Sequence, residues 1–215
     1  MLVDSVYVFI PVQKLKDTML RMALSKMNLI HLHIVDNRGY RLESKQFPQL
    51  NPPGTGFYSL EEMKDIIEFG LSIGIDCLPE LELTTHSQFL TSVFPGLHCK
   101  VDTAEPNGWA MCVGSPSFYE IITVLINEMA EVFPYPVLHI GTDEIIMYDL
   151  PKIWPDWYDC KHCRALAESI GIKLSTAEEV EERKRNGTFL EKGIDGINEL
   201  FIYTIHKIYD IVKKA

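Results

Sequence analysis

The chain has 215 residues, a formal net charge of −10 and 47% hydrophobic residues, which is the composition of a globular protein rather than a disordered or fibrous one. No apolar run is long enough to span a membrane, and the excess of acidic residues argues against nucleic acid or an anionic membrane as a partner. The length predicts one domain, residues 1–215, near the lower end of the range for an eight-stranded α/β barrel.

Short apolar runs alternate with helical patterns in the first half of the chain. Residues 2–8 predict a strand, and Pro11 opens a helix with apolar residues at helical spacing. Residues 28–35 predict a second strand, and a polar loop follows it. Ser59 and Glu62 form the start of a capping box, which predicts a helix to about residue 73, and residues 74–79 predict a third strand.

The second half begins with a long predicted loop over residues 81–115. Pro116 starts a helix, residues 136–141 predict a fourth strand, and two further helices are predicted near 161–170 and 189–213. The charged run EEVEERKRNG between them is typical of a solvated helix face. Four β-then-α units in succession predict an α/β fold with a parallel sheet and external helices.

Ionisable residues occur where each predicted strand ends. Because catalytic residues of α/β barrels lie at the carboxyl ends of the strands, these positions predict a functional site. They are Asp4, His33, Asp36, Glu80, Glu82, Asp143 and Glu144.

The adjacent carboxylates Asp143 and Glu144 form the most informative pair, in the motif HIGTDE at 139–144. Repulsion between them and partial burial favour one ionised group and one protonated group, which suits protonation of a leaving-group oxygen. The alternative is a helix N-terminus, where acidic residues are favoured by the helix dipole.

Two histidines, His31 and His33, lie on one face of the second predicted strand. This spacing fits either a metal pair or two hydrogen-bonded interior histidines, and the lack of a further ligand nearby favours the second interpretation. One hypothesis for the function is therefore a metal hydrolase that uses His31 and His33 with His139 and Asp143.

The five cysteines do not indicate a full disulfide framework, although Cys99 and Cys112 could pair in an oxidising compartment. The motif Cys160-Lys-His-Cys163 resembles half of a zinc knuckle, but no second CxxC exists, so a structural zinc is not expected. The tryptophans of the predicted loops fit either an aromatic wall for a sugar ring or a cover for the core; they are Trp109, Trp154 and Trp157.

Four segments resemble, in order and spacing, the β-N-acetylhexosaminidases of glycoside hydrolase family 20. They are VDSVYVFIPV, KMNLIHLHIVDNRGYRLESKQFPQL, GFYSLEEMKDIIEFGLSIGIDCLPELELTTH and VFPYPVLHIGTDE. The most specific pieces are H-x-H-x-x-D at 31–36, Pro-Glu at 79–80 with His86, and H-I-G-x-D-E at 139–144.

The resemblance implies retaining, substrate-assisted hydrolysis of terminal β-linked GlcNAc or GalNAc, without metal or cofactor. Glu144 would be the general acid and then the base, Asp143 would orient the acetamido group, and Asp36 with His86 would form a buried pair that supports Glu144. The resemblance also implies an amino-sugar glycan as the partner and a lysosomal or secreted location, although no signal peptide is visible. Further supporting or substrate-binding positions would be His33, Glu80 and Asp4.

The chain departs from the family at several positions. Tyr7 stands where the family has a sugar-binding Arg, Thr84 and Thr85 replace Pro-Gly, Thr142 replaces a Gly, and Asn37 replaces an Asp. No strands are predicted after residue 141, which predicts an incomplete TIM barrel of about four βα units plus C-terminal helices, with open sheet edges that favour self-association. These departures leave a second hypothesis open: a catalytically inactive relative that acts as a binding or interaction module.

Overall fold

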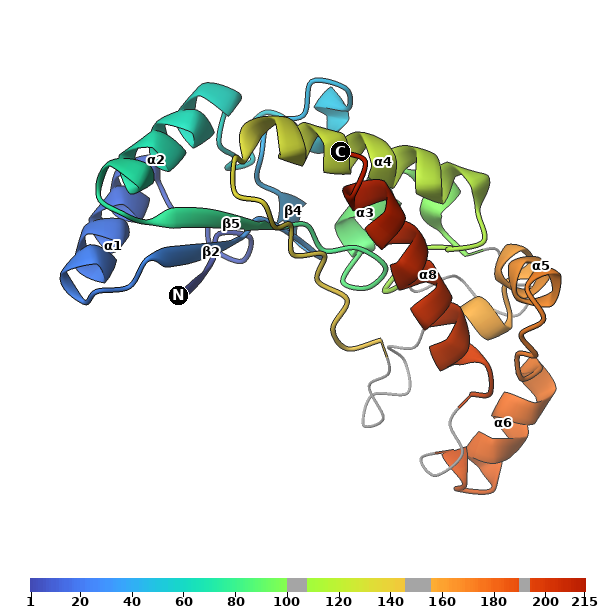
Figure 1. Cartoon of the computed structure of the whole chain (residues 1–215). Coiled ribbons are helices and arrows are strands. Elements are labelled where there is room, and N and C mark those ends of the chain that lie inside the picture. Colours follow the sequence, from blue (N-terminus) through green and yellow to red (C-terminus); the bar gives the residue numbers. More distant parts are fainter. Residues whose placement is uncertain (100–107, 146–155, 190–193) are drawn as a thin grey trace. The chain divides into compact units, whose positions relative to one another are not determined.

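The computed structural model describes residues 1–99, 108–145, 156–189 and 194–215 (Figure 1). Two compact units emerge. The first combines Met1–Leu83 with Val124–Gly141 and Ala215, and the second combines Thr84–Thr123 with Thr142–Lys214.

The first unit contains a parallel three-stranded sheet in the order β1-β2-β5, formed by β1 (Leu2–Asp4), β2 (Leu29–His33) and β5 (Asp76–Glu80). In β2 the side chains alternate, since Ile30 and Leu32 are fully buried while His31 and His33 point to the other face and are partly exposed. The predicted α/β class with a parallel sheet is therefore confirmed, whereas the incomplete TIM barrel stays a prediction.

The predicted fourth strand is wrong as a strand. Of residues 136–141, only His139 joins the sheet, through one isolated parallel bridge to Glu80. Backbone hydrogen bonds from Leu81 N to His139 O (2.9 Å) and from Leu83 N to Ile140 O (3.1 Å) still hold the segment beside the end of β5. The apolar pattern identified the correct neighbour of β5 but not a regular ladder.

The second predicted strand also ends earlier than expected. It stops at His33, and a separate antiparallel pair follows, made of β3 (Val35–Asp36) and β4 (Gly39–Tyr40). This break turns Asp36 out of the parallel ladder and into a hairpin at its end.

Helices α1 (Val12–Leu24) and α2 (Leu60–Ser72) pack side by side, and α2 contacts β5 of the sheet (Figure 1). The capping box predicted at the start of α2 is confirmed: Glu62 N donates to Ser59 Oγ (3.1 Å) and Ser59 N donates to Glu62 Oε2 (2.9 Å). A short 3₁₀ turn, η1 (Pro48–Leu50), lies in the loop between β4 and α2.

The second unit is helical in the part that the structure describes. The segment predicted as a loop over 81–115 contains α3 (Gln88–Val93) and η2 (Pro95–Leu97), and α4 (Pro116–Val132) begins as predicted and continues into the first unit. Further elements are η3 (Asp156–Tyr158), α5 (Lys161–Ser169), α6 (Ala177–Arg185) and α8 (Ile197–Val212).

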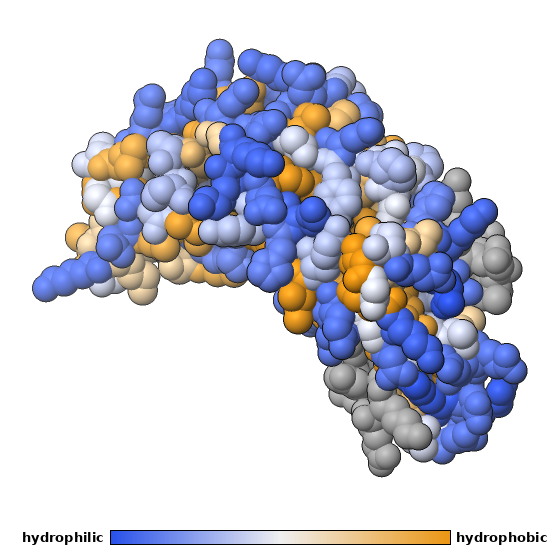
Figure 2. All heavy atoms as spheres, turned by 45° about the vertical axis from the view of Figure 1, so that its right-hand side comes forward, coloured by the Kyte–Doolittle hydropathy of each residue, from blue (hydrophilic) through white to orange (hydrophobic). Residues whose placement is uncertain are grey.

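Helix α6 carries the charged run that predicted a solvated helix face. Only Val180 of this helix is buried, and the surface around it is largely hydrophilic (Figure 2). Among the described helices, none combines the length and the hydropathy that crossing a membrane requires.

Candidate active site

The polar residues at the strand ends of the first unit form one row across the sheet. Asp4 pairs in register with His33, His33 pairs with Glu80, and Glu80 forms the isolated bridge with His139. The predicted clustering of these strand ends is therefore confirmed within this unit, because a parallel register brings the carboxyl ends of neighbouring strands together.

Glu80 is the centre of this row. Its buried carboxylate lies 2.7 Å from His33 Nδ1 and 3.0 Å from His31 Nε2 through Oε2, and 3.0 Å from His139 Nδ1 through Oε1. The other ring nitrogen of His33, Nε2, lies 2.8 Å from Asp36 Oδ2. For His33, the interpretation as a hydrogen-bonded interior histidine is confirmed.

The two carboxylates determine the charge of His33. Burial favours the neutral imidazole, but the hydrogen bonds to Asp36 and Glu80 outweigh it and raise the pKa of His33 to about 10. Burial likewise acts against the charge of Glu80, but its contacts with His33 outweigh that effect and lower the pKa of Glu80. His33 is thus protonated at neutral pH and lies between the carboxyl groups of Asp36 and Glu80.

Asp4 lies at the end of β1 and closes a turn. Its Oδ1 accepts hydrogen bonds from the backbone N–H of Val6 (2.7 Å) and of Tyr7 (3.1 Å). Beside this turn, the guanidinium of Arg38 lies 4.5 Å from the centre of the Tyr7 ring. Sequence reasoning missed Arg38, because no motif marks the residue that stacks on Tyr7.

In the second unit, His86 meets the carboxylate pair. His86 Nε2 lies 3.2 Å from Glu144 Oε2 and 3.6 Å from Asp143 Oδ2. The imidazole side chain is only 14% exposed, whereas the side chains of Asp143 and Glu144 are 63% and 45% exposed. A shielded imidazole therefore faces two carboxylates that solvent and ligands can reach.

Trp109 and Thr85 contact the group formed by His86, Asp143 and Glu144. The Trp109 ring centre lies 4.2 Å from that of His86, and Trp109 Nε1 donates to Glu144 O (3.2 Å). Thr85 Oγ1 donates to Asp143 O (2.8 Å). Trp109 is buried, which favours its interpretation as a cover for the core. It also contacts the candidate site.

The backbone around these residues adopts rare conformations. Positive φ angles occur at Thr84 (+77°), His86 (+48°), Thr142 (+81°) and Glu144 (+52°), and only Lys26 shares this feature among the other described non-glycine residues. Such backbone is disfavoured for side chains with a Cβ and most of all for β-branched Thr. Strain is therefore concentrated in the two segments that carry His86 and the carboxylate pair.

Gly141 precedes this strained segment in the HIGTDE motif. Its φ is +62°, and a Cβ added there would collide with the carboxylate of Glu82, which is buried. The positive φ favours glycine, and any side chain there would also force the buried Glu82 carboxylate to move. The motif glycine thus lets residues 139–141 pack against the end of β5.

Other predicted features have separate outcomes. Trp157 is fully buried and its Nε1 donates to Met111 O (2.8 Å), whereas Trp154 lies outside the described residues. His31 groups with Glu80 and His139, and Asp143 groups with His86 and Glu144, whereas the metal-hydrolase set of His31, His33, His139 and Asp143 draws on both units and stays a prediction. The expected Asp36–His86 pair links residues of different units and stays a prediction.

The disulfide between Cys99 and Cys112, which the sequence left open, is not present in the structure. Both residues are free thiols, and each contacts Cys163 instead, at Sγ–Sγ distances of 4.0 and 3.7 Å. The polar loop between the two cysteines in the sequence gave no sign of this third partner.

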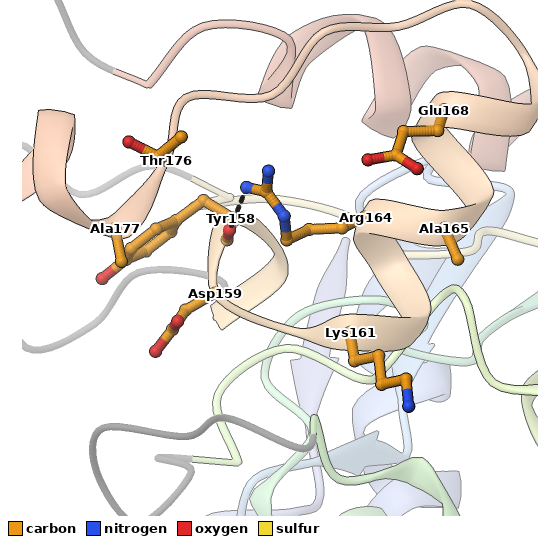
Figure 3. A pocket seen from close by; sticks show the side chains of 8 residues that line it. All are labelled: Tyr158, Asp159, Lys161, Arg164, Ala165, Glu168, Thr176 and Ala177. Atoms are coloured by element: carbon orange, nitrogen blue, oxygen red, sulfur yellow. Dashed lines mark hydrogen bonds between the residues drawn. The ribbon is translucent and has the colours of Figure 1, made fainter.

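A surface pocket of about 530 Å³ lies elsewhere in the second unit (Figure 3). Its lining mixes the charges of Lys161 and Arg164 with those of Asp159 and Glu168, and the Arg164 guanidinium donates to the backbone oxygens of Tyr158 (3.0 Å) and Ser175 (3.2 Å). It contains none of the sequence-predicted site residues, and its arginine is already engaged in holding the backbone.

Comparison with known proteins identifies the family of the chain. The model of the glycosyl hydrolase family 20 catalytic domain matches residues 1–215. The chain belongs to this family. A β-hexosaminidase of Akkermansia muciniphila is 29% identical over 187 residues, which cover 78% of this chain and 37% of that protein.

Solved structures of family 20 agree with this assignment. The exo-β-N-acetylglucosaminidase of Vibrio harveyi, solved with N-acetylglucosamine, has a TM-score of 0.70 and 28% identity, over 93% of this chain and 33% of the other. The Flavobacterium johnsoniae chitobiase matches all of this chain and 29% of its own length, with a TM-score of 0.76 and 24% identity, which supports the fold. The chain is thus β-hexosaminidase-like and spans about a third of the length of such relatives.

Proposed function

We propose that this chain carries the acid/base centre of a β-N-acetylhexosaminidase that removes terminal β-linked GlcNAc or GalNAc by substrate-assisted, retaining hydrolysis. The observation that supports the proposal is the group formed by His86, Asp143 and Glu144, with His86 Nε2 at 3.2 Å from the exposed Glu144 carboxylate. A shielded imidazole beside an accessible carboxyl group is suited to proton transfer at the site surface.

In the first step, Glu144 donates its proton to the glycosidic oxygen while the acetamido oxygen of the substrate attacks the anomeric carbon. The C–O bond to the leaving group breaks and an oxazolinium intermediate forms. Asp143 accepts the acetamido N–H hydrogen bond and offsets the positive charge that develops on the ring. His86 orients the Glu144 carboxyl group.

In the second step, Glu144 takes a proton from water, whose oxygen attacks the same carbon from the face that the leaving group vacated. The oxazoline ring opens and the acetamido group is restored, so that the two inversions give net retention. Glu144 ends the cycle protonated again, and neither step uses a metal.

The decisive experiment compares an unactivated disaccharide, chitobiose, with the p-nitrophenyl glycoside of GlcNAc. For Glu144→Gln, we expect kcat on chitobiose to fall by about 10²–10⁴-fold and less on the aryl glycoside, whose leaving group needs little protonation. Equal activity of the variant and the parent on chitobiose would refute the role of Glu144.

The inactive binding module remains the second candidate, and Tyr7 and the strained Thr142 favour it. A thiazoline mimic of the oxazolinium intermediate distinguishes the two. Binding of the mimic without turnover of either substrate supports the binding module, and binding with turnover that depends on Glu144 supports the enzyme.

A further inference from the structure

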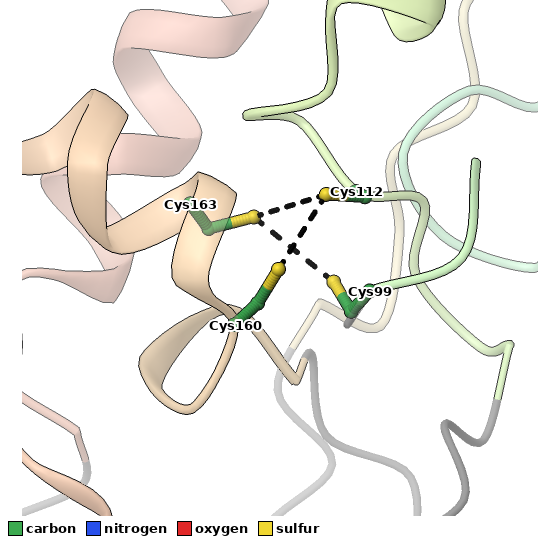
Figure 4. Close-up of side chains that lie close together, drawn as sticks. All are labelled: Cys99, Cys112, Cys160 and Cys163. Atoms are coloured by element: carbon green, nitrogen blue, oxygen red, sulfur yellow. Dashed lines mark hydrogen bonds between the residues drawn. The ribbon is translucent and has the colours of Figure 1, made fainter. Parts of the chain in front are cut away.

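Four of the five cysteines converge inside the second unit (Figure 4). Cys99, Cys112, Cys160 and Cys163 are all buried, and one sulfur atom from each lies within 4.8 Å of all the others. The shortest Sγ–Sγ distances are 3.6 Å for Cys112–Cys160, 3.7 Å for Cys112–Cys163 and 4.0 Å for Cys99–Cys163.

The chain is built so that these thiols meet. Cys160 is the N-cap of α5 and Cys163 lies in its first turn, so the CxxC spacing turns both sulfurs to the same side of the helix start. Gly114 allows the facing loop to approach, since a Cβ there would collide with the backbone of His162 and Cys163. The hydrogen bond from Cys112 N to Leu97 O (2.7 Å) ties the two halves of that loop together.

The N-terminus of α5 also lies at this point, and its positive dipole end favours thiolates. The fifth cysteine, Cys77, is buried in the first unit, where burial raises the pKa of its thiol to about 12.

The distances distinguish between a metal site and disulfides. A zinc ion bound tetrahedrally by four thiolates at about 2.3 Å places the sulfurs about 3.8 Å apart, and the observed distances of 3.6, 3.7 and 4.0 Å lie around this value. A disulfide needs about 2.05 Å. A cluster of several irons would separate the sulfurs further, because its metal atoms lie between them.

We propose that Cys99, Cys112, Cys160 and Cys163 form a closed structural zinc site. On binding, four S–H groups release their protons to solvent and four Zn–S bonds form, with no change of oxidation state. All four positions are filled by protein, so the ion has no place for water or substrate. The proposal differs from the expectation from the sequence, which was a chain without metal.

The site joins two segments that are distant in the sequence and that flank the candidate active site. Met111, beside Cys112, donates its N–H to Thr84 O (2.8 Å), and Trp109 contacts His86. On the other side, Trp157 Nε1 donates to Met111 O (2.8 Å) three residues before Cys160. Zinc would therefore fix the loop that supports His86, independently of whether a sugar is hydrolysed.

The experiment measures metal on the 215-residue chain purified under reducing conditions without chelators. We expect one zinc per chain by elemental analysis, and X-ray absorption with four sulfurs at about 2.3 Å. Cys112→Ser should lose the zinc, and the matched control Cys77→Ser, which removes a buried thiol far from the site in sequence, should keep it. Neither readout depends on activity, so this proposal and the proposed function can fail separately.

A measurement without variants covers the case in which Cys112→Ser does not fold. Exchange of the parent chain into Co²⁺ should give the intense visible absorption of a tetrahedral thiolate site. Failure to take up Zn²⁺ or Co²⁺, iron as the bound metal, or a mass that is four hydrogens lower because two disulfides have formed would each overturn the proposal.

Discussion

The carboxylates of the two groups of ionisable residues differ in their exposure to solvent. In the first unit, the side chains of Glu80 and Asp36 are 7% and 8% exposed and surround the cation of His33. In the second unit, Asp143 and Glu144 are 63% and 45% exposed beside His86. Buried, fully paired charges position the ends of the strands, whereas accessible carboxylates can contact a substrate.

The largest expected effect comes from breaking the buried network. Glu80→Gln removes the charge that three histidines share and leaves the His33 cation with one partner, so we expect the free energy of unfolding to fall by about 3–5 kcal/mol. Urea denaturation measures it.

The matched change in the other group is Asp143→Asn. It should change stability by less than about 0.5 kcal/mol, because an exposed carboxylate has little to lose, while it lowers any turnover of a GlcNAc glycoside. Equal destabilisation by the two substitutions would remove the distinction between the buried and the accessible group.

The free energy of unfolding should also depend on pH through His33 and Glu80. The folded-state pKa of His33, about 10, lies above the ordinary histidine value of 6.5, so the contribution of His33 to stability is complete below about pH 6.5 and is lost as the pH rises toward 10. The lowered pKa of Glu80 acts at the other end, since the contribution of Glu80 is present above the ordinary glutamate value of 4.5 and is lost at lower pH. Stability should therefore be highest between these limits.

We expect unfolding free energy to decline above pH 6.5 by at most about 1.4 kcal/mol per pH unit, and an NMR titration should show one of the seven histidines still protonated at pH 9. His33→Gln identifies this signal if the variant folds. A full set of histidines titrating near neutral pH would contradict the cation between Asp36 and Glu80.

Local chemistry made part of this structure predictable from the sequence. The Ser59–Glu62 capping box and the apolar spacing of α4 are local signals, and each gave the correct helix start. The row formed by Asp4, His33 and Glu80 followed from one general property of parallel sheets. The motif segments for His86 and Glu144 came together as the family resemblance implied.

Long-range packing could not be predicted in the same way. The cysteine cluster joins Cys99 and Cys112 to a CxxC 48 or more residues away, and counting CxxC motifs missed it because the two facing cysteines have another spacing. The predicted fourth strand failed because its apolar pattern does not show that only His139 forms a bridge. Nor does the pattern reveal positive φ angles at residues other than glycine.

The smallest expected effects concern the backbone strain beside the exposed carboxylates of the second unit. Thr142 has φ of +81°, where the family motif has glycine. Relief of about 1–3 kcal/mol of strain, less the entropy that a glycine adds to the unfolded chain, predicts that Thr142→Gly raises the unfolding free energy by about 1 kcal/mol. Thermal and urea denaturation of the variant measure the gain.

The control for this substitution is Lys26→Gly in the first unit. Lys26 has φ of +58° just after α1, where its N–H donates to Ala23 O in an ordinary helix-ending turn. An unbranched side chain tolerates this conformation better than threonine does, so the gain should be at most about half as large. A larger gain at Lys26 than at Thr142 would show that the strain is a property of any left-handed residue and is not concentrated at the candidate active site.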